Sequence, residues 1–144
     1  MTAPRGLTAL LLAAAVALGG LACQGNVFSL KVGDCFNGGG ASEVSDVTTV
    51  DCASPHDAEV YSVFDYPNAP SAYPGDDAIG AAADTRCRQD FAIFVGLSYD
   101  ESIYNSNKLR PTSKSWESGD RTIDCLITSA DGTQLTGSAK GTKK

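Results

Sequence analysis

The chain has 144 residues, a formal net charge of −6 and a sequence pI near 4.5. An acidic surface with scattered bases argues against a nucleic-acid-binding protein and against a patch for anionic lipid. The length fits one domain with a single modest core.

The apolar stretch "LTALLLAAAVAL", residues 7–18, predicts a secretory signal peptide over residues 1–22. It follows the basic residue Arg5 and precedes small residues. Its 12 residues are too few to cross a bilayer as a helix, because a span needs about 20.

The sequence "GGLAC", residues 19–23, resembles a bacterial lipobox, which is cleaved before its cysteine and lipidated there. Ala22 fits this pattern, whereas Gly20 departs from the usual Leu or Val. Five cysteines are an odd number, and setting Cys23 aside leaves an even set for disulfides. We therefore expect lipidation of Cys23, residues 23–30 as a membrane-proximal linker, and a protein on the extracytoplasmic face of the cell membrane. The alternative is ordinary cleavage nearby and a secreted product.

Strand signals dominate the mature chain. Runs rich in β-branched and apolar residues between turn formers predict strands at 47–52, 58–66, 102–111 and 121–129. Strict alternation would place Ala58, Val60 and Phe64 on one face of the second strand, with Glu59, Tyr61 and Val63 on the other. The last strand would set Ile123, Cys125 and Ile127 against Thr122, Asp124 and Thr128.

Turns and short segments complete this pattern. Residues 111–120 predict one short helical turn with Thr112 or Ser113 as its cap. Asp131-Gly132 predicts a hairpin into residues 133–138. We expect the folded domain to span residues 31–137 and residues 138–144 to form a disordered tail.

One helix is predicted from about Asp76 to Val95, with acids in its first turn and Gly96 at its end. Asp84 and Arg88 are spaced as an i, i+4 ion pair on its wet side. Its apolar residues form one stripe: Ile79, Ala83, Cys87, Phe91, Phe94 and Val95. Strands before and after a single helix predict an α+β fold, in which one long helix packs on an antiparallel sheet of four to five strands.

Cys35, Cys52, Cys87 and Cys125 predict two disulfides, because an exported chain folds in oxidising surroundings. Their gaps of 17, 35 and 38 residues lack the short ligand spacing of a zinc site. Spacing alone allows three pairings. Cys87 lies on the apolar stripe of the helix and Cys125 on the apolar face of the last strand. A helix packed on that sheet joins these two and leaves Cys35 to pair with Cys52.

The one histidine of the chain lies in "VDCASPHDAEV", between two predicted strands. A metal site needs three or four convergent ligands, and no second histidine can join His56. Catalysis needs a nucleophile beside the base, and Cys52 is expected to be oxidised. We therefore expect Pro55, His56 and Asp57 to form a structural corner, with Glu59 as a solvated or salt-bridged strand residue. No cofactor and no metal are expected.

Trp116 has two interpretations, a binding anchor or a core residue. A lone tryptophan in a small domain is more often core, and we expect that here. Asp100 and Glu101 would suit glycosidase chemistry, although adjacent acids after a helix are usually just solvated.

Five motifs, in order, resemble the septum formation-related domain, a family of small actinobacterial exported or lipid-anchored proteins. They are "VGDCF" at 32–36, "VDCASPHDAEV" at 50–60, "YPGDDA" at 73–78, the helix with Cys87, and "PTSKSWESGDRTIDCL" at 111–126. The resemblance covers most of the chain from Leu30 to Gly137. It implies work at the cell envelope or the division septum and brings no catalytic residues with it. It also implies that the matching cysteines, His56 and Trp116 define the fold.

We expect a non-catalytic, membrane-tethered module that binds an envelope protein or a cell-wall polymer and no nucleic acid. The alternative is an envelope hydrolase that uses acids such as Asp57 or Asp100. A pocket that holds convergent acids with raised pKa values would favour the hydrolase. A dry His56 beside a disulfide would favour the binding module.

Overall fold

The computed structural model describes residues 24–26, 29–38 and 46–144. The predicted signal peptide, residues 1–22, and the predicted lipidation site Cys23 lie outside these residues. Among the helices of the described ranges, none combines the length and apolar character that crossing a bilayer requires.

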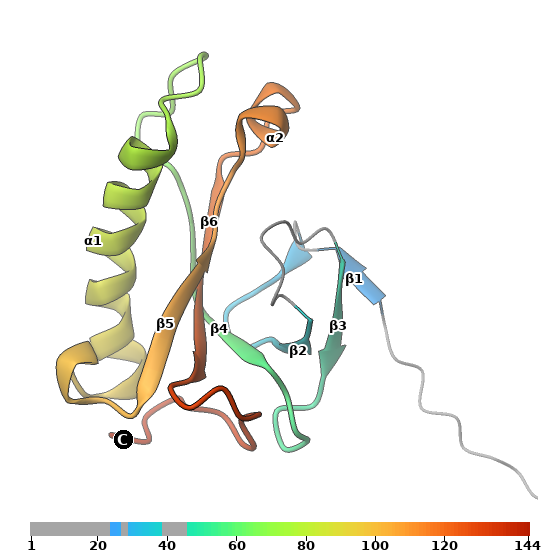
Figure 1. The fold of residues 1–144 in the computed structure, drawn as a ribbon, viewed down its shortest axis with the longest axis vertical. Helices are drawn as coiled ribbons and strands as arrows, with labels where there is room; N and C mark the ends of the chain where they lie inside the picture. Colours follow the sequence, from blue (N-terminus) through green and yellow to red (C-terminus); the bar gives the residue numbers. More distant parts are fainter. Residues whose placement is uncertain (1–23, 27–28, 39–45) are drawn as a thin grey trace, which may run out of the picture.

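The described chain forms one antiparallel sheet, one long helix and two short helical turns (Figure 1). The elements are β1 (Gln24–Asn26), β2 (Cys35–Asn37), β3 (Asp46–Val50), β4 (Ala58–Asp65), α1 (Asp76–Val95), η2 (Tyr99–Glu101), β5 (Tyr104–Leu109), α2 (Ser113–Glu117) and β6 (Thr122–Ser129). The six strands lie in the order β1-β3-β2-β4-β6-β5. This confirms the predicted α+β class. The short strands β1 and β2, which sequence patterning missed, enlarge the sheet, and β1 lies in the segment expected to be a linker.

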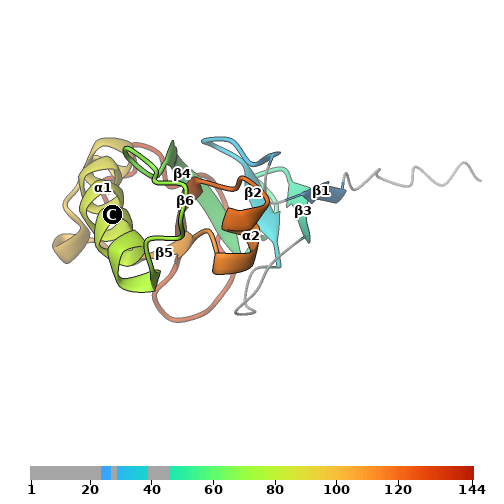
Figure 2. The same ribbon diagram turned by 90° about the horizontal axis from the view of Figure 1, so that it is seen from above.

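The central strands β4 and β6 are covered on both faces. Figure 2 shows α1 on one side of β4, β6 and β5, and the curled half of the sheet with β1, β2 and β3 on the other. The core on the α1 side includes Tyr61, Cys87, Phe91, Phe94, Cys125 and Ile127. The core on the opposite side comprises Leu30, Phe36, Val47, Ala58, Val60 and Leu126. The curled half of the sheet therefore covers the face of β4 and β6 that α1 leaves open.

Helix α1 confirms its predicted stripe, because all six apolar residues named for it are buried. Gly96 ends the helix in the left-handed region at φ 81°, a conformation that glycine adopts without steric cost. The predicted ion pair between Asp84 and Arg88 is wrong. Arg88 instead binds Asp100 with two hydrogen bonds of 2.9 and 3.0 Å, and Asp84 binds Lys108 of β5.

Strand β4 carries an irregularity that sequence alternation did not predict. Its register with β6 shifts between Val60 and Ser62. Tyr61 turns toward α1, where its hydroxyl donates to the Cys87 carbonyl at 3.1 Å, whereas Val60 packs in the opposite core. Past this shift Phe64 packs on the α1 side. Val60 and Phe64 therefore do not share a face, because one extra residue in the strand inverts the alternation.

Both disulfides have the predicted pairing. Cys35 is joined to Cys52 and Cys87 to Cys125, with Cα–Cα distances of 5.2 and 5.6 Å. The second bond connects α1 directly to β6, and the first connects β2 to the turn that precedes β4. Each part that covers a face of the central strands is thus covalently attached.

The chain after β6 does not form the predicted hairpin. Asp131 Oδ1 accepts hydrogen bonds from the backbone N–H and the hydroxyl of Thr133 at 3.0 and 2.6 Å. A hydrogen bond from the Ser129 hydroxyl, together with these two from Thr133, lowers the pKa of Asp131 to about 2. After this turn the chain reaches the segment that precedes β4, where Leu135 forms an isolated bridge with His56.

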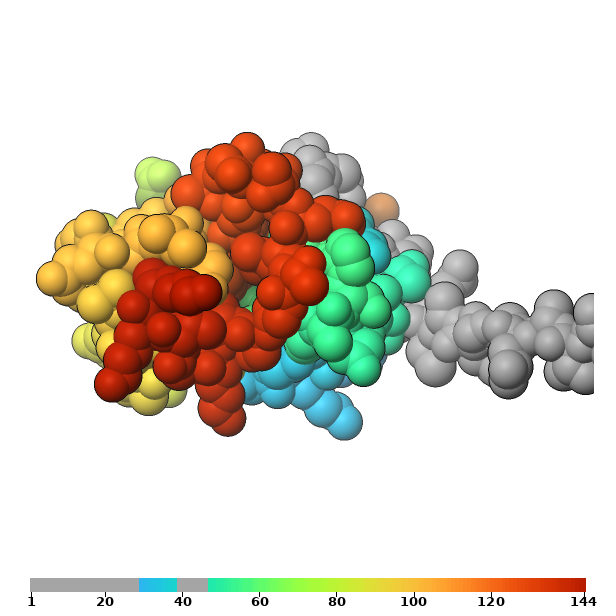
Figure 3. All heavy atoms as spheres, turned by 90° about the horizontal axis from the view of Figure 1, so that it is seen from below, coloured from blue at the N-terminus to red at the C-terminus, as the bar shows by residue number. Residues whose placement is uncertain are grey.

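The expectation of a disordered tail at residues 138–144 is also wrong. Ala139 is 1% exposed. The N–H groups of Gly141 and Lys143 donate to the carbonyls of Phe94 and Val95 at 2.8 and 3.0 Å. These are last-turn carbonyls of α1, which have no partner within the helix. Figure 3 shows the C-terminal segment in red, spread across the lower face of the molecule. Backbone contacts order this small, polar segment, so its composition gave no sign of it.

Candidate functional site

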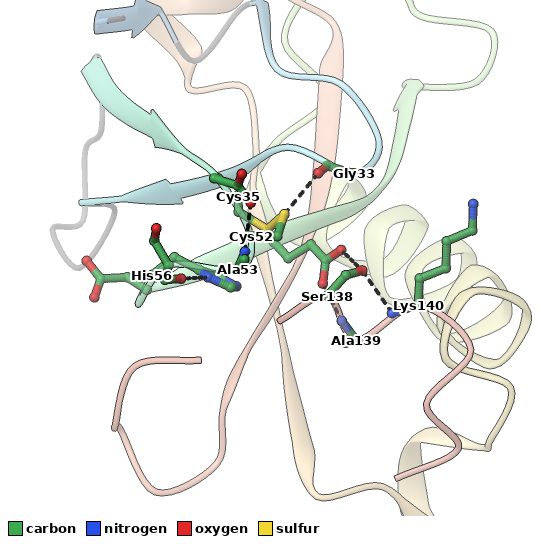
Figure 4. Close-up of a disulfide and its surroundings, with 12 residues drawn as sticks. Gly33, Cys35, Cys52, Ala53, His56, Ser138, Ala139 and Lys140 are labelled. Carbon is green, nitrogen blue, oxygen red and sulfur yellow. Dashed lines mark hydrogen bonds between the residues drawn. A yellow bond between two sulfur atoms is a disulfide. The ribbon is translucent and has the colours of Figure 1, made fainter. Parts of the chain in front are cut away.

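His56 lies at the turn between β3 and β4 and is fully buried. Its Nδ1 lies 2.8 Å from the carbonyl oxygen of Ser54, so Nδ1 carries the proton, because a carbonyl only accepts. Its backbone N–H and carbonyl exchange hydrogen bonds of 3.0 and 2.8 Å with Leu135. Its Nε2 has no hydrogen-bond partner in the described chain. Figure 4 shows the ring folded back beneath the Cys52–Ala53 segment, next to the disulfide.

Asp57 is fixed by donors from two distant segments. Its Oδ2 accepts the N–H of Gly38 at 2.9 Å, and its Oδ1 accepts from Gln134 Nε2 at 3.0 Å. Its own N–H donates to Phe36. A carboxylate that holds backbone and amide donors in this way stabilises a turn. The contacts of His56 and Asp57 favour the structural interpretation of this corner.

Glu59 is buried, with 1% of its surface exposed, and forms no ion pair within the described residues, so the expectation of a solvated or salt-bridged residue is wrong. Its Oε2 accepts the N–H of Ala139 at 2.7 Å, and its Oε1 accepts from the Ser138 hydroxyl. The Glu59 carboxylate and the sulfurs of Cys35 and Cys52 lie within 4.8 Å of one another. Because the two sulfurs are bonded to each other, Glu59 alone keeps a free ligand atom. Its function here is to hold the C-terminal segment against β4.

The acids named for a hydrolase do not converge. Asp57 contacts Gly38 and Gln134, whereas Asp100 is bound to Arg88 on α1 and has 75% of its side chain exposed. The two carboxylates share no partner. Glycosidase chemistry needs two carboxyl groups on either side of one scissile bond, and each of these two is held by separate partners of its own.

Asp124 is the titratable residue that sequence reasoning missed. It was assigned to the polar face of β6, yet it is only 5% exposed. Its partners in register are Val63 of β4 and Leu109 of β5. Burial, with a smaller effect of the nearby Asp120 charge, raises the pKa of Asp124 to about 7. Its Oδ1 accepts no hydrogen bond from the part of the chain described.

Trp116 is a core residue, as expected, with 2% of its surface exposed. Its Nε1 donates to the Ser71 carbonyl at 3.2 Å, and the Arg121 guanidinium lies 3.8 Å above its ring. The rings of Tyr66 and Tyr73 pack edge-on against it. It anchors α2 to the sheet and presents no surface to a partner.

A polar depression of about 270 Å³ lies between α1 and β5. It is lined by Gly80, Asp84, Ser106, Asn107, Lys108 and Arg110. Lys108 is paired with Asp84, whereas Arg110 forms no ion pair with any carboxylate of the described residues. A Cβ at position 80 would lie 3.0 Å from Arg110 Nη1, so the glycine leaves space for the guanidinium. We name this depression the α1–β5 groove.

Comparison with known proteins shows which family the chain resembles. The profile of the family described as "Septum formation" matches residues 32–144, which confirms the resemblance identified from the motifs. A protein of Mycobacterium tuberculosis and one of Mycobacterium bovis, both named "Putative lipoprotein LppN", are each 37% identical over 117 residues. The match covers 78% of this chain and 63% of each relative. No solved structure matches the chain.

The buried imidazole predicts a stability effect of His56→Ala. The free energy of unfolding should fall by about 1 to 3 kcal/mol, because a packed, hydrogen-bonded side chain is lost. His56→Asn is the matched control, since its amide can still donate to the Ser54 carbonyl, and it should lose less. Urea denaturation of the three proteins measures this. An alanine variant as stable as the parent would contradict the structural role.

The raised pKa of Asp124 predicts a pH-dependent stability. A carboxyl whose pKa rises from 3.8 to about 7 on folding contributes stability at low pH that is lost as the pH rises through 7. Relative to Asp124→Asn, the parent should therefore lose stability between pH 4 and 8, on the order of 4 kcal/mol. Urea denaturation across this range measures the difference, with the exposed Asp100→Asn as control. A difference that stays constant with pH would refute the assignment.

Proposed function

Since the chain belongs to the Septum formation family, we propose that it is a non-catalytic module of the cell envelope that acts by binding an envelope protein or a cell-wall polymer. The name of the two mycobacterial relatives and the lipobox-like "GGLAC" support anchoring by lipid at Cys23 outside the cell membrane. The chain spans 63% of the length of these relatives, so their activities and partners are not carried over.

The proposal that the module is non-catalytic is carried by one observation, which is that the carboxylates already form structural hydrogen bonds or ion pairs. Asp57 holds a turn, Asp100 is paired with Arg88, and Glu59 binds the C-terminal segment. A general acid or base must reach the substrate from a position within hydrogen-bonding distance. Carboxylates already occupied by structural donors are poorly suited to that task.

One observation favours the alternative that the protein is a hydrolase. The raised pKa of Asp124 is of the kind found at catalytic acids. Its Oδ1 is sealed from solvent, however, and the neighbouring side chains in register, Val63 and Leu109, are apolar. Geometry therefore favours a carboxyl buried for structural reasons over one that meets a substrate.

Replacing the acids tests this proposal. Asp57→Asn, Asp100→Asn and Asp124→Asn should each complement a deletion strain in cell length and septum morphology, to the extent that the variant protein is folded. Thermal unfolding of each variant gives the folded fraction. A hydrolase would behave differently, because one stable variant would lose function by orders of magnitude. That result would overturn the proposal.

Lipidation of Cys23 has a direct chemical test. The intact mass of protein extracted from membranes should correspond to a chain that begins at Cys23 and carries diacylglycerol, with or without a further acyl chain. Two or more acyl chains give stable anchoring. Cys23→Ser should abolish the lipid mass and release the protein from the membrane fraction. A parent protein that begins elsewhere and lacks lipid would exclude the anchor.

A further inference from the structure

Strand β5 is an edge of the sheet whose outward hydrogen-bonding groups can be identified. The N–H of Tyr104 donates to the side chain of Ser102 rather than to β6. Just before β6, the backbone carbonyl of Arg121 accepts the N–H of Tyr66, which follows β4. In an antiparallel ladder the two sides alternate by residue, so even-numbered residues of β6 bond to β5. The backbone N–H and carbonyl groups of the even-numbered residues of β5 then point away from β6, toward the open edge.

Ser106 and Lys108 therefore direct their N–H and carbonyl groups to the open edge. Among the described residues no turn or loop backbone pairs with either. Strand β5 has six residues and no proline among them. An unpaired edge of this kind is a template for a further strand.

The side chains of these even-numbered residues point toward α1 and line the α1–β5 groove. The Ser106 hydroxyl lies 2.6 Å from that of Tyr61, and Lys108 binds Asp84. Arg110 continues this phase just beyond the strand, where Gly80 leaves space for it. Because Asp84 neutralises Lys108, Arg110 is the cation of the groove without a carboxylate partner among the described residues, and its Nη1 makes only a long contact of 3.5 Å with the Asp76 carbonyl oxygen.

From these features we infer that β5 binds an extended peptide as an added strand, with an acidic side chain of that peptide on Arg110. This inference rests on the proposed binding function and names its site and ligand class. Main-chain hydrogen bonds to Ser106 and Lys108 supply affinity, and the α1–β5 groove supplies specificity through every second side chain. A guanidinium binds a carboxylate through two parallel hydrogen bonds.

Two competing explanations of the edge are weaker. Lysine on an edge strand can block pairing, but the Lys108 side chain is drawn to Asp84 on α1, away from the edge. Pairing of β5 with a second copy would place two Arg110 side chains, neither with a carboxylate partner, on one face. Like charges opposite one another oppose such pairing, whereas an acidic strand satisfies them.

Peptide selection is the first test. Heptapeptides displayed on phage are selected on the full chain, extracted from membranes in detergent. We expect the selected pool to alternate β-branched residues with polar ones and to be enriched in glutamate or aspartate at one position. A pool without enrichment in acids, or a chain that self-associates as peptide binding is lost, would overturn the inference.

Matched variants then test the geometry by fluorescence anisotropy with a selected peptide. Lys108→Pro removes the outward N–H, which β6 does not use, and Lys108→Ala removes the same ion pair but keeps the N–H. Binding should weaken about tenfold in the proline variant relative to the alanine variant. Arg110→Gln should weaken binding of the acidic peptide about tenfold and leave its glutamine counterpart unchanged. Thermal unfolding confirms that the variants are folded.

Equal binding by the proline and alanine variants would exclude strand addition. The two proposals fail separately. If Lys108→Pro abolishes neither peptide binding nor complementation of the deletion strain, the groove inference fails and the binding module stands. If a stable acid-to-amide variant loses function while the peptide still binds β5, the non-catalytic proposal fails and the groove inference stands.

Discussion

The pairing of β4 with β6 is the contact on which the rest of the molecule depends. Both strands are eight residues long, and both of their faces are buried by other parts of the chain. Alternation along β4 sends Val60 to one core and Tyr61 to the other, and the register shift between Val60 and Ser62 places Phe64 on the α1 side as well. Bulges strengthen the twist and bend of a strand. A bend at this place suits a sheet whose first three strands curl over the face that α1 leaves open.

The parts of the chain that pack on β4 and β6 are attached to them by disulfides or by hydrogen bonds to a buried carboxylate. The disulfide of Cys87 and Cys125 attaches α1 to β6, and that of Cys35 and Cys52 attaches β2 to the corner before β4. The C-terminal segment has no cysteine and is held by the buried carboxylate of Glu59 instead. Closing loops of 38 and 17 residues stabilises a domain by about 4 and 3 kcal/mol in the chain-entropy model.

The buried carboxylate of Glu59 stabilises the fold in a different way from the disulfides. A buried carboxylate carries a large desolvation cost, which only good donors offset. The Ala139 N–H and the Ser138 hydroxyl are such donors, and both come from the C-terminal segment. That segment in turn satisfies the last carbonyls of α1. Strand β4, the tail and the end of α1 are therefore coupled through one side chain.

Sequence patterning succeeded where side chains alone determine the outcome. The stripe of α1 and the apolar face of β6 set the cysteine pairing, because a helix on a sheet brings Cys87 opposite Cys125. It failed where backbone contacts or an unexpected cover decide. Asp124 looks like a residue of a wet face, yet it is buried in the folded chain, with Val63 and Leu109 as its partners in register.

Residues 138–144 were mispredicted for a similar reason. Their small and polar composition predicts disorder, and the buried acceptors that bind their N–H groups lie far away in the sequence. The candidate site follows this division as well. Asp57 and His56 were found from their neighbours in sequence, whereas the α1–β5 groove joins residues of α1 and β5 that are 22 or more positions apart and depends on strand order. No local pattern marks Gly80 as space for Arg110, because an isolated glycine in a helix reads only as a weak helix former.

The overall charge bears on how such a groove can discriminate. A chain with a net charge of −6 repels acidic partners at long range. Screening limits that repulsion to about 8 Å at physiological ionic strength, whereas the contact with Arg110 acts at hydrogen-bonding distance. An acidic strand therefore meets a barrier on approach and an attraction only in register with β5. Segments with acid in the wrong position keep the repulsion without the compensating contact, so the negative surface and the Arg110 guanidinium together select for register as well as for charge.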